Sequence, residues 1–174
     1  VEYFTPFDFS KDVTAFHYLD SGLSYVGGET STLSGLDHLE GEVVNIISEG
    51  STQTSKTVSS GGITLDTGTE QAKVGLLYSS DLQTMRLDEG YQETTQTKTK
   101  RIYDLSIRFQ ETVGASVGPN AANLTALDFR ASGSAMNLPI PLFTGDKTIE
   151  FDTGYGTEGL VYVQQPQALP MTIL

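Results

Sequence analysis

Cysteine is absent from the 174-residue chain, so disulfide bonds and thiolate metal sites are excluded. The chain has no tryptophan and only two histidines, His17 and His38. A zinc site would need both histidines together with carboxylates, and nothing in the sequence places them near one another. No run of about 18 apolar residues is present, so no membrane-spanning helix is predicted. Walker, Rossmann and G-x-S-x-G motifs are also missing.

Basic residues are few. Ten lysines and arginines face 22 aspartates and glutamates, which gives a net charge of −12. Such a surface repels phosphate backbones, so tight binding of nucleic acid is not expected. The charge would suit a surface along which DNA moves without adhering. It would suit an ordinary soluble protein equally well.

Alternation of apolar and polar residues, the pattern of half-buried strands, dominates the chain. It is clearest over 101–110. The four residues predicted to face the core there are Tyr103, Leu105, Ile107 and Phe109. The segment 41–50 is apolar on both faces, which is typical of a central strand closed by a turn at Glu49-Gly50. A hairpin is predicted around the turn Ser60-Gly61-Gly62.

Helix signals are confined to two short candidates, 80–85 and 118–130. Pro139 and Pro141 mark an edge or connecting segment, and the polar stretch 91–101 is predicted to be an exposed strand extension or arm. Gly-rich turns separate the predicted strands at intervals of about 8–12 residues. The predicted fold class is therefore all-β, an antiparallel barrel or sandwich with one or two short helical turns.

Two copies of Asp-Thr-Gly, beginning at Asp66 and Asp152, raise the possibility of an aspartic protease. That chemistry needs two carboxylates about 3 Å apart, supplied by two similar lobes. The residues after Gly68 and Gly154 do not repeat one another, and the chain is far shorter than two-lobed proteases. The favoured interpretation is a turn at each strand end, with aspartate capping the turn and glycine at positive φ. No catalytic residues are predicted.

Acidic residues near glycines raise the possibility of calcium. Calcium needs six to eight oxygens, usually from several carboxylates in one loop, and no loop here reaches that density. Ordinary acidic turns are therefore favoured, and no metal or cofactor site is predicted. His38 is predicted to be a hydrogen-bonded structural histidine. The residues considered as calcium ligands were Asp66, Glu70, Asp88, Glu89, Glu93, Asp152, Thr157 and Glu158.

One basic cluster stands out from the acidic background. It could contact DNA or an acidic neighbouring subunit, and it could equally be a solvated strand end. Its members are Lys98, Lys100, Arg101 and Arg108.

An ordered series of short blocks resembles the tail nozzle or tail-tubular structural proteins of short-tailed bacteriophages and prophages. The series covers about residues 15–174, although no single block is specific. Leu77 departs from the pattern, in which proline or another residue is expected. The blocks are Gly35-Leu36, His38-Leu39-Glu40-Gly41, Glu49-Gly50, the hairpin Val58 to Gly62, Val74-Gly75-Leu76 and Tyr78.

The resemblance implies a structural virion protein, not an enzyme, with a small β-barrel module similar to one named after the ubiquitin-activating enzyme. Copies would form a ring, hexameric in the full-length protein, around the channel through which DNA leaves the capsid. Its neighbours would be a portal-side adaptor and distal tail proteins, and passing DNA would make only weak, non-specific contacts. The protein would be made in the bacterial host cytoplasm and reside in the virion tail, with no membrane partner.

The chain is expected to be a piece of a longer protein, because it begins at Val1 and stops within an apolar run. Residues 1–14 are predicted to lead in from a preceding domain, and 15–174 to form the module. An alternative is a glycan- or receptor-binding module of a tail fibre-like protein, which would need exposed aromatics on a shallow face. The candidates for that are Tyr3, Tyr18, Tyr25, Tyr91 and Tyr155.

Overall fold

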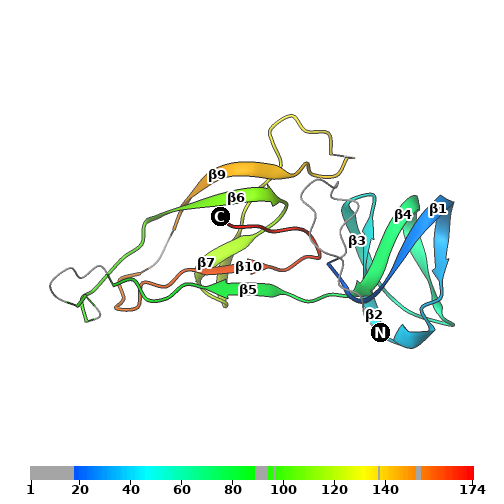
Figure 1. The fold of residues 1–174 in the computed structure, drawn as a ribbon, viewed down its shortest axis with the longest axis horizontal. Helices are drawn as coiled ribbons and strands as arrows, with labels where there is room; N and C mark the ends of the chain where they lie inside the picture. Colours follow the sequence, from blue (N-terminus) through cyan, green and yellow to red (C-terminus); the bar gives the residue numbers. More distant parts are fainter. Residues whose placement is uncertain (1–17, 89–93, 96, 137, 152–153) are drawn as a thin grey trace. The chain divides into compact units, whose positions relative to one another are not determined.

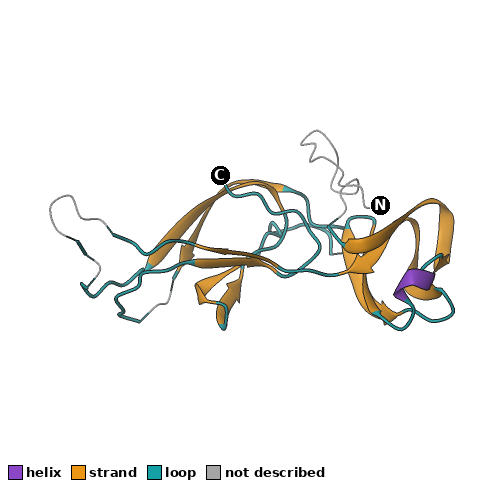
Figure 2. Cartoon of the chain, turned by 60° about the horizontal axis from the view of Figure 1, so that its bottom comes forward, coloured by secondary structure: helices purple, strands orange, loops and turns teal. Residues whose placement is uncertain are grey.

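The computed structural model describes residues 18–88, 94–95, 97–136, 138–151 and 154–174. These residues fold mainly as antiparallel strands, which confirms the all-β prediction (Figures 1 and 2). Among the described residues no sheet closes into a barrel, and sandwich-like sheets form instead. The predicted lead-in segment 1–14 lies outside the described residues.

The chain divides into two compact units within the predicted module. Unit 1 holds the described residues of 18–78, 130–142 and 167–170, and unit 2 holds those of 79–129, 143–166 and 171–174. No helix in the described part of the chain is long and apolar enough to cross a membrane.

Unit 1 contains one antiparallel sheet with the strand order β1-β4-β2-β3. The single helical element among the described residues is the 3₁₀ turn η2 (Asp37–Leu39), which lies between β1 and β2 in the chain and is purple in Figure 2. β2 lies between β4 and β3, so the prediction of a central strand is confirmed. The four strands are β1 (Asp20–Ser34), β2 (Val43–Ser48), β3 (Ser51–Thr57) and β4 (Gly62–Leu76).

The core of unit 1 forms from the inward-facing apolar residues of β1, β2 and β4, from η2, and from Leu36 and Val58 in the connecting segments. Leu36 and Val44 are 0% exposed, and Ile46 and Val74 are 1% exposed. Each aliphatic side chain buried in this way contributes about 1.5–3 kcal/mol. This burial fixes the register, since a one-residue slip would turn the apolar face outward.

Two tight turns in unit 1 occur where the sequence predicts them. Glu49 and Gly50 have φ of 50° and 81° and join β2 to β3 through the Ser48–Ser51 pair. Ser60 and Gly61 have φ of 54° and 67°, inside the Ser59–Gly62 bridge. Positive φ at both central residues is typical of the hairpin turn whose twist matches the flanking strands.

The second turn does not produce the predicted simple hairpin. In the sheet β3 pairs with β2, while β4 pairs with β2 and β1, so β3 and β4 are not neighbouring strands. The two sides of the turn are joined by the isolated Ser59–Gly62 bridge. The two backbone hydrogen bonds of that bridge measure 3.0 and 3.2 Å. The conformation of the turn depends on its own residues and can be predicted from them. The choice of strand partners depends on long-range packing and cannot.

Unit 2 contains a four-stranded antiparallel sheet, β5-β10-β7-β8, and a two-stranded ribbon, β6-β9. The C-terminal residues continue this ribbon, because the amide of Leu174 donates to the carbonyl of Arg108 and Phe109 bridges to Ile173. The strands are β5 (Ser80–Gln83), β6 (Asp104–Thr112), β7 (Ser116–Asn120), β8 (Asn123–Ala126), β9 (Phe143–Glu150) and β10 (Tyr162–Gln165).

The predicted core face of β6 is only partly correct. Phe109 is 0% exposed and Ile107 8%, whereas Leu105 is half-buried. Tyr103 is 71% exposed, so its assignment to the core was wrong. β6 begins at Asp104, and the alternation continues past the point where the core ends.

Both predicted helices are wrong. The first, 80–85, is largely the edge strand β5, and the second, 118–130, contains the end of β7 and all of β8. The side-chain oxygen of Asn120 accepts the amides of Ala122 and Asn123 at 3.0 and 3.1 Å. This side chain satisfies the amides of the turn, so an alanine-containing stretch that resembles a helix closes a hairpin instead.

Beyond its sheet, unit 2 extends into a tip formed by 84–88, 97–103 and 154–160, at the left of Figure 1. Lys100 and Gly156 exchange backbone hydrogen bonds of 2.6 and 3.0 Å. The amide of Thr84 donates to the carbonyl of Val161 at 2.9 Å. The three segments therefore form a connected structure.

Candidate functional site

Asp66 lies inside β4, so its predicted place in a turn at a strand end was wrong. Thr30 pairs with Thr69 and Thr32 with Thr64. Between these pairs β1 advances by two residues while β4 advances by five, so Asp66-Thr67-Gly68 forms a bulge. A bulge of this kind bends the strand and increases its twist.

Contacts hold this bulge from both sides. The ammonium of Lys56 on β3 donates to the carboxylate of Asp66 at 2.5 Å, and this hydrogen bond lowers the pKa of Asp66. Gly68 does not adopt the predicted positive φ. A Cβ at Gly68 would lie 2.8 Å from a carboxylate oxygen of Glu29, so the flexible Glu29 side chain, which packs against this glycine, would have to move.

In the second Asp-Thr-Gly, Asp152 and Thr153 lie outside the described residues. Gly154 is described and lines the groove at the tip. Asp66 therefore has a structural role in β4, and the hypothesis of a catalytic pair gains no geometric support from the described residues.

Asp66, Asp88 and Glu158, three of the candidate calcium ligands, make ordinary protein contacts. Glu158 forms an ion pair with Arg86 at 2.6 Å. Asp88 accepts hydrogen bonds from the amide and hydroxyl of Thr95 at 2.8 and 2.9 Å. Within the described ranges, no group of three His, Cys, Asp or Glu side chains could hold a metal ion. Glu89 and Glu93 lie outside those ranges.

His38 contacts the backbone of β1, where its Nε2 lies 2.9 Å from the carbonyl oxygen of Ser21. This hydrogen bond confirms the structural interpretation of His38. His17 lies outside the described residues.

The predicted basic cluster is divided between two parts of unit 2. Arg108 on β6 forms two hydrogen bonds with Asp146 of β9, at 2.6 and 2.8 Å. Lys100 at the tip donates to the carbonyl of Leu87 at 2.5 Å. Arg101 stacks over the ring of Tyr155 at 5.7 Å. Three of the four basic residues thus hold neighbouring segments of unit 2 together.

Two glutamates accept backbone amides near the tight turns of unit 1: Glu40 from the Ser60-Gly61 turn, and Glu49, itself a turn residue, from β4. The carboxylate of Glu40 accepts the amides of Ser60 and Gly61 at 2.9 and 2.8 Å. That of Glu49 accepts the amides of Glu70 and Gln71 at 3.1 and 2.8 Å. The hydrogen bond from the Gly61 amide is the largest cause of the lowered pKa of Glu40. The hydrogen bond from the Gln71 amide is the largest cause of the lowered pKa of Glu49. Nothing in the local sequence reveals these contacts, since the partners are about twenty residues apart.

Among the described residues of unit 1, Lys73 has the amine with the most perturbed pKa. It lies on β4 between Ser24 of β1 and Ile47 of β2. Half-burial there lowers the pKa of Lys73 to about 8, because the charged ammonium loses water contacts.

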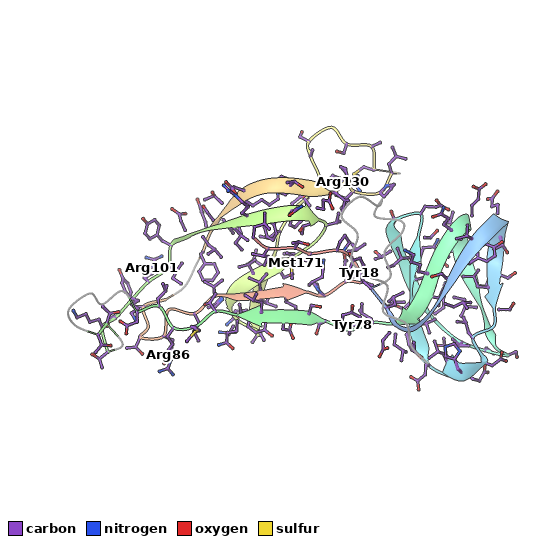
Figure 3. The ribbon with its side chains drawn as sticks, viewed as in Figure 1. Tyr18, Tyr78, Arg86, Arg101, Arg130 and Met171 are labelled. Carbon is purple, nitrogen blue, oxygen red and sulfur yellow. The ribbon has the colours of Figure 1, made fainter. Side chains whose placement is uncertain are left out.

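A shallow groove of about 500 Å³ lies at the tip of unit 2. Arg86 and Arg101 mark this end of the unit in Figure 3. The side chain of Tyr155 beside the groove is exposed, whereas Tyr18 and Tyr25 are half-buried and belong to unit 1. Tyr3 and Tyr91 lie outside the described residues. Polar residues lining the groove include Lys100, Asn120, Asn123, Tyr155 and Glu158.

Large apolar side chains are exposed from all three segments of the tip, and we call these residues the tip surface. Met85 is 90% exposed, Tyr155 77%, Tyr103 71% and Leu87 51%. Exposed apolar side chains occur singly on any protein, but a group from one part of the fold is typical of an interaction site. Sequence reasoning identified only part of this surface: it named Tyr155 as a candidate exposed aromatic, but the alternation of 101–110 placed Tyr103 in the core.

A comparison with models of known protein families found no match, and neither did a comparison with curated proteins.

Proposed function

We propose that the chain is a structural module of a phage tail nozzle-like protein, and that copies of it form part of the ring through which DNA leaves the virion. The tip surface of Met85, Leu87, Tyr103 and Tyr155 is the observation that carries the proposal. Exposed apolar side chains of this kind are unfavourable in water and become favourable when a neighbouring protein covers them. The resemblance of the ordered sequence blocks to tail nozzle proteins suggests that the assembly is a ring.

The proposed mechanism is passive. The excess of acidic residues, with a net charge of −12, repels a passing DNA duplex and prevents adhesion. The carboxylates of Glu40, Glu49 and Asp66 connect turns and strands within the sheet of unit 1. The chain would act in the virion tail, beside a portal-side adaptor and distal tail proteins, without catalysis.

Sedimentation velocity of the gene product from which the chain comes tests the proposal. The unsubstituted protein is expected to sediment as a ring-sized oligomer. Met85→Ser with Tyr155→Ser is expected to weaken assembly or the attachment of a distal partner, because both side chains are exposed and their loss should not unfold unit 2. A matched control is Val26→Ser, since Val26 is 75% exposed but belongs to unit 1. A gene product that stays monomeric at all concentrations, alone and with its portal partner, would contradict the proposal.

A second candidate function is the binding of a host saccharide in the tip groove. Tyr155 offers an aromatic ring, and the amides of Asn120 and Asn123 offer hydrogen bonds at the same groove. Binding on a glycan array that Tyr155→Ala removes would favour this function. A blank array together with ring assembly would favour the conduit.

A further inference from the structure

The sheet β5-β10-β7-β8 of unit 2 ends in two open edges, β5 on one side and β8 on the other. Each edge strand has four residues, Ser80–Gln83 and Asn123–Ala126. Among the described residues, neither strand pairs with a second strand. Proteins blunt such edges with very short strands, charged side chains, proline or a covering segment. Both strands are short and β5 carries Asp81, but neither contains lysine or proline, and β8 has no charged residue.

The directions of the two edge strands are complementary. β5 is antiparallel to β10, β10 to β7, and β7 to β8. β5 and β8 therefore run in opposite directions. If β8 of a second copy lies beside β5 of the first, with both sheets in the same orientation, the antiparallel alternation continues without interruption. This contact is head-to-tail, the kind that forms a ring when the rotation between copies closes.

Backbone hydrogen bonds show which groups face outward. The amide of Thr84 donates to Val161 of the strand beside it, and the amide of Leu127 donates to Ala115. In antiparallel pairs every second residue points its N–H and C=O to the same neighbour. The alternation leaves two residues on each strand with backbone groups that point away from the sheet. These are Asp81 and Gln83 on β5, and Leu124 and Ala126 on β8.

A row of side chains on one face of the sheet also favours an added strand beside β5. The register places Leu82, Val163, Val117 and Thr125 in one row across the four strands. Val163 and Val117 are 2% exposed, whereas Leu82 at the edge is 45% exposed. A fifth strand beside β5 would extend this row and cover Leu82.

We propose that β5 of one copy pairs with β8 of the next copy, so that the sheets of unit 2 join edge to edge around the ring. The occupant of each edge is therefore a second copy of this chain. The inference rests on the proposed ring and names the contact that closes it. A two-fold β5–β5 contact would use only one edge and leave β8 open.

Cysteine cross-linking tests the contact, since the chain has no cysteine of its own. Gln83→Cys and Ala126→Cys are prepared separately in the gene product, with any cysteine outside the 174 residues replaced by serine. Both positions are exposed, so folding should be unaffected. The assembled variants are treated with a short bismaleimide, alone and after co-assembly in equal amounts. Covalent dimers are expected from the mixture and not from either variant alone.

Other outcomes overturn the inference in distinguishable ways. Cross-linking of Gln83→Cys with itself would indicate a two-fold contact. Rings without any cross-link would place the subunit contacts elsewhere and leave the proposed function intact. A gene product that never assembles would overturn the proposed function as well.

Proline substitution gives a second, independent readout. Gln83→Pro removes an outward N–H of β5, which edge strands tolerate, whereas Gln83→Ala keeps it. Gln83→Pro is expected to weaken each contact by about fivefold, the value of one backbone hydrogen bond, with Gln83→Ala unchanged. Equal assembly of the two variants, both shown to be folded by circular dichroism, would contradict β5 pairing.

Discussion

Replacing Phe109 by alanine tests the packing of unit 2 where it is most enclosed. The ring of Phe109 is 0% exposed and meets Phe129 edge-on, with the two centroids 5.4 Å apart. Truncating a buried phenylalanine costs about 3–5 kcal/mol through lost burial and the cavity left behind. The lost edge-to-face pair is worth about 0.5–1.5 kcal/mol beyond its buried area. We therefore expect a loss in the upper half of the range, about 4–5 kcal/mol.

Tyr103→Ala is the matched control, because Tyr103 has the same position in the sequence alternation but is 71% exposed. Its loss should change stability by about 0.5 kcal/mol or less. Urea unfolding followed by circular dichroism gives the free energy, and hydrogen exchange over 104–112 assigns the loss to unit 2. A cost below about 1 kcal/mol at Phe109, or equal costs at both positions, would refute the assigned core.

Three further predictions concern unit 1. Glu40→Gln should lower stability at pH 7, because the ionised carboxylate accepts the turn amides, and the difference should shrink as the pH falls through the lowered pKa of Glu40. A difference in the free energy of unfolding that stays constant as the pH is lowered would contradict this. Lys73 should titrate near pH 8 when its ¹³Cε resonance is followed by NMR. Because the unfolded chain then binds the proton more tightly, the stability of the protein should rise between pH 8 and the ordinary lysine pKa of 10.5. Titration only above pH 10 would contradict the half-burial of Lys73. Ser60→Asn should raise the free energy of unfolding by about 0.5–1 kcal/mol, because asparagine tolerates the φ of 54° better than serine; an unchanged urea midpoint would be the contrary result.

Local sequence signals predicted local structure well. Glu49-Gly50 and Ser60-Gly61 form the turns that their residue types favour, because positive φ depends on the turn itself. The alternation of β6 identified Ile107 and Phe109 as core. It could not show where the core ends, since that depends on which strands cover the ribbon, and Tyr103 was misplaced for this reason.

Features that depend on distant partners were not predictable. The bulge at Asp66 arises from the pairing of β4 with β1, and its carboxylate meets Lys56 only after β3 is in place. The hairpin from β7 to β8 resembled a helix because the capping role of Asn120 appears only in the folded turn. The tip surface was not predicted as a whole for the same reason, since alternation alone does not distinguish a strand face that packs in the core from one that is exposed.

Electron microscopy of the purified gene product would show directly whether the proposed ring exists. Closed rings of identical copies around an open channel are expected, with the copies joined through unit 2. Particles without a channel, or single copies at concentrations far above those in an infected cell, would contradict the proposed ring.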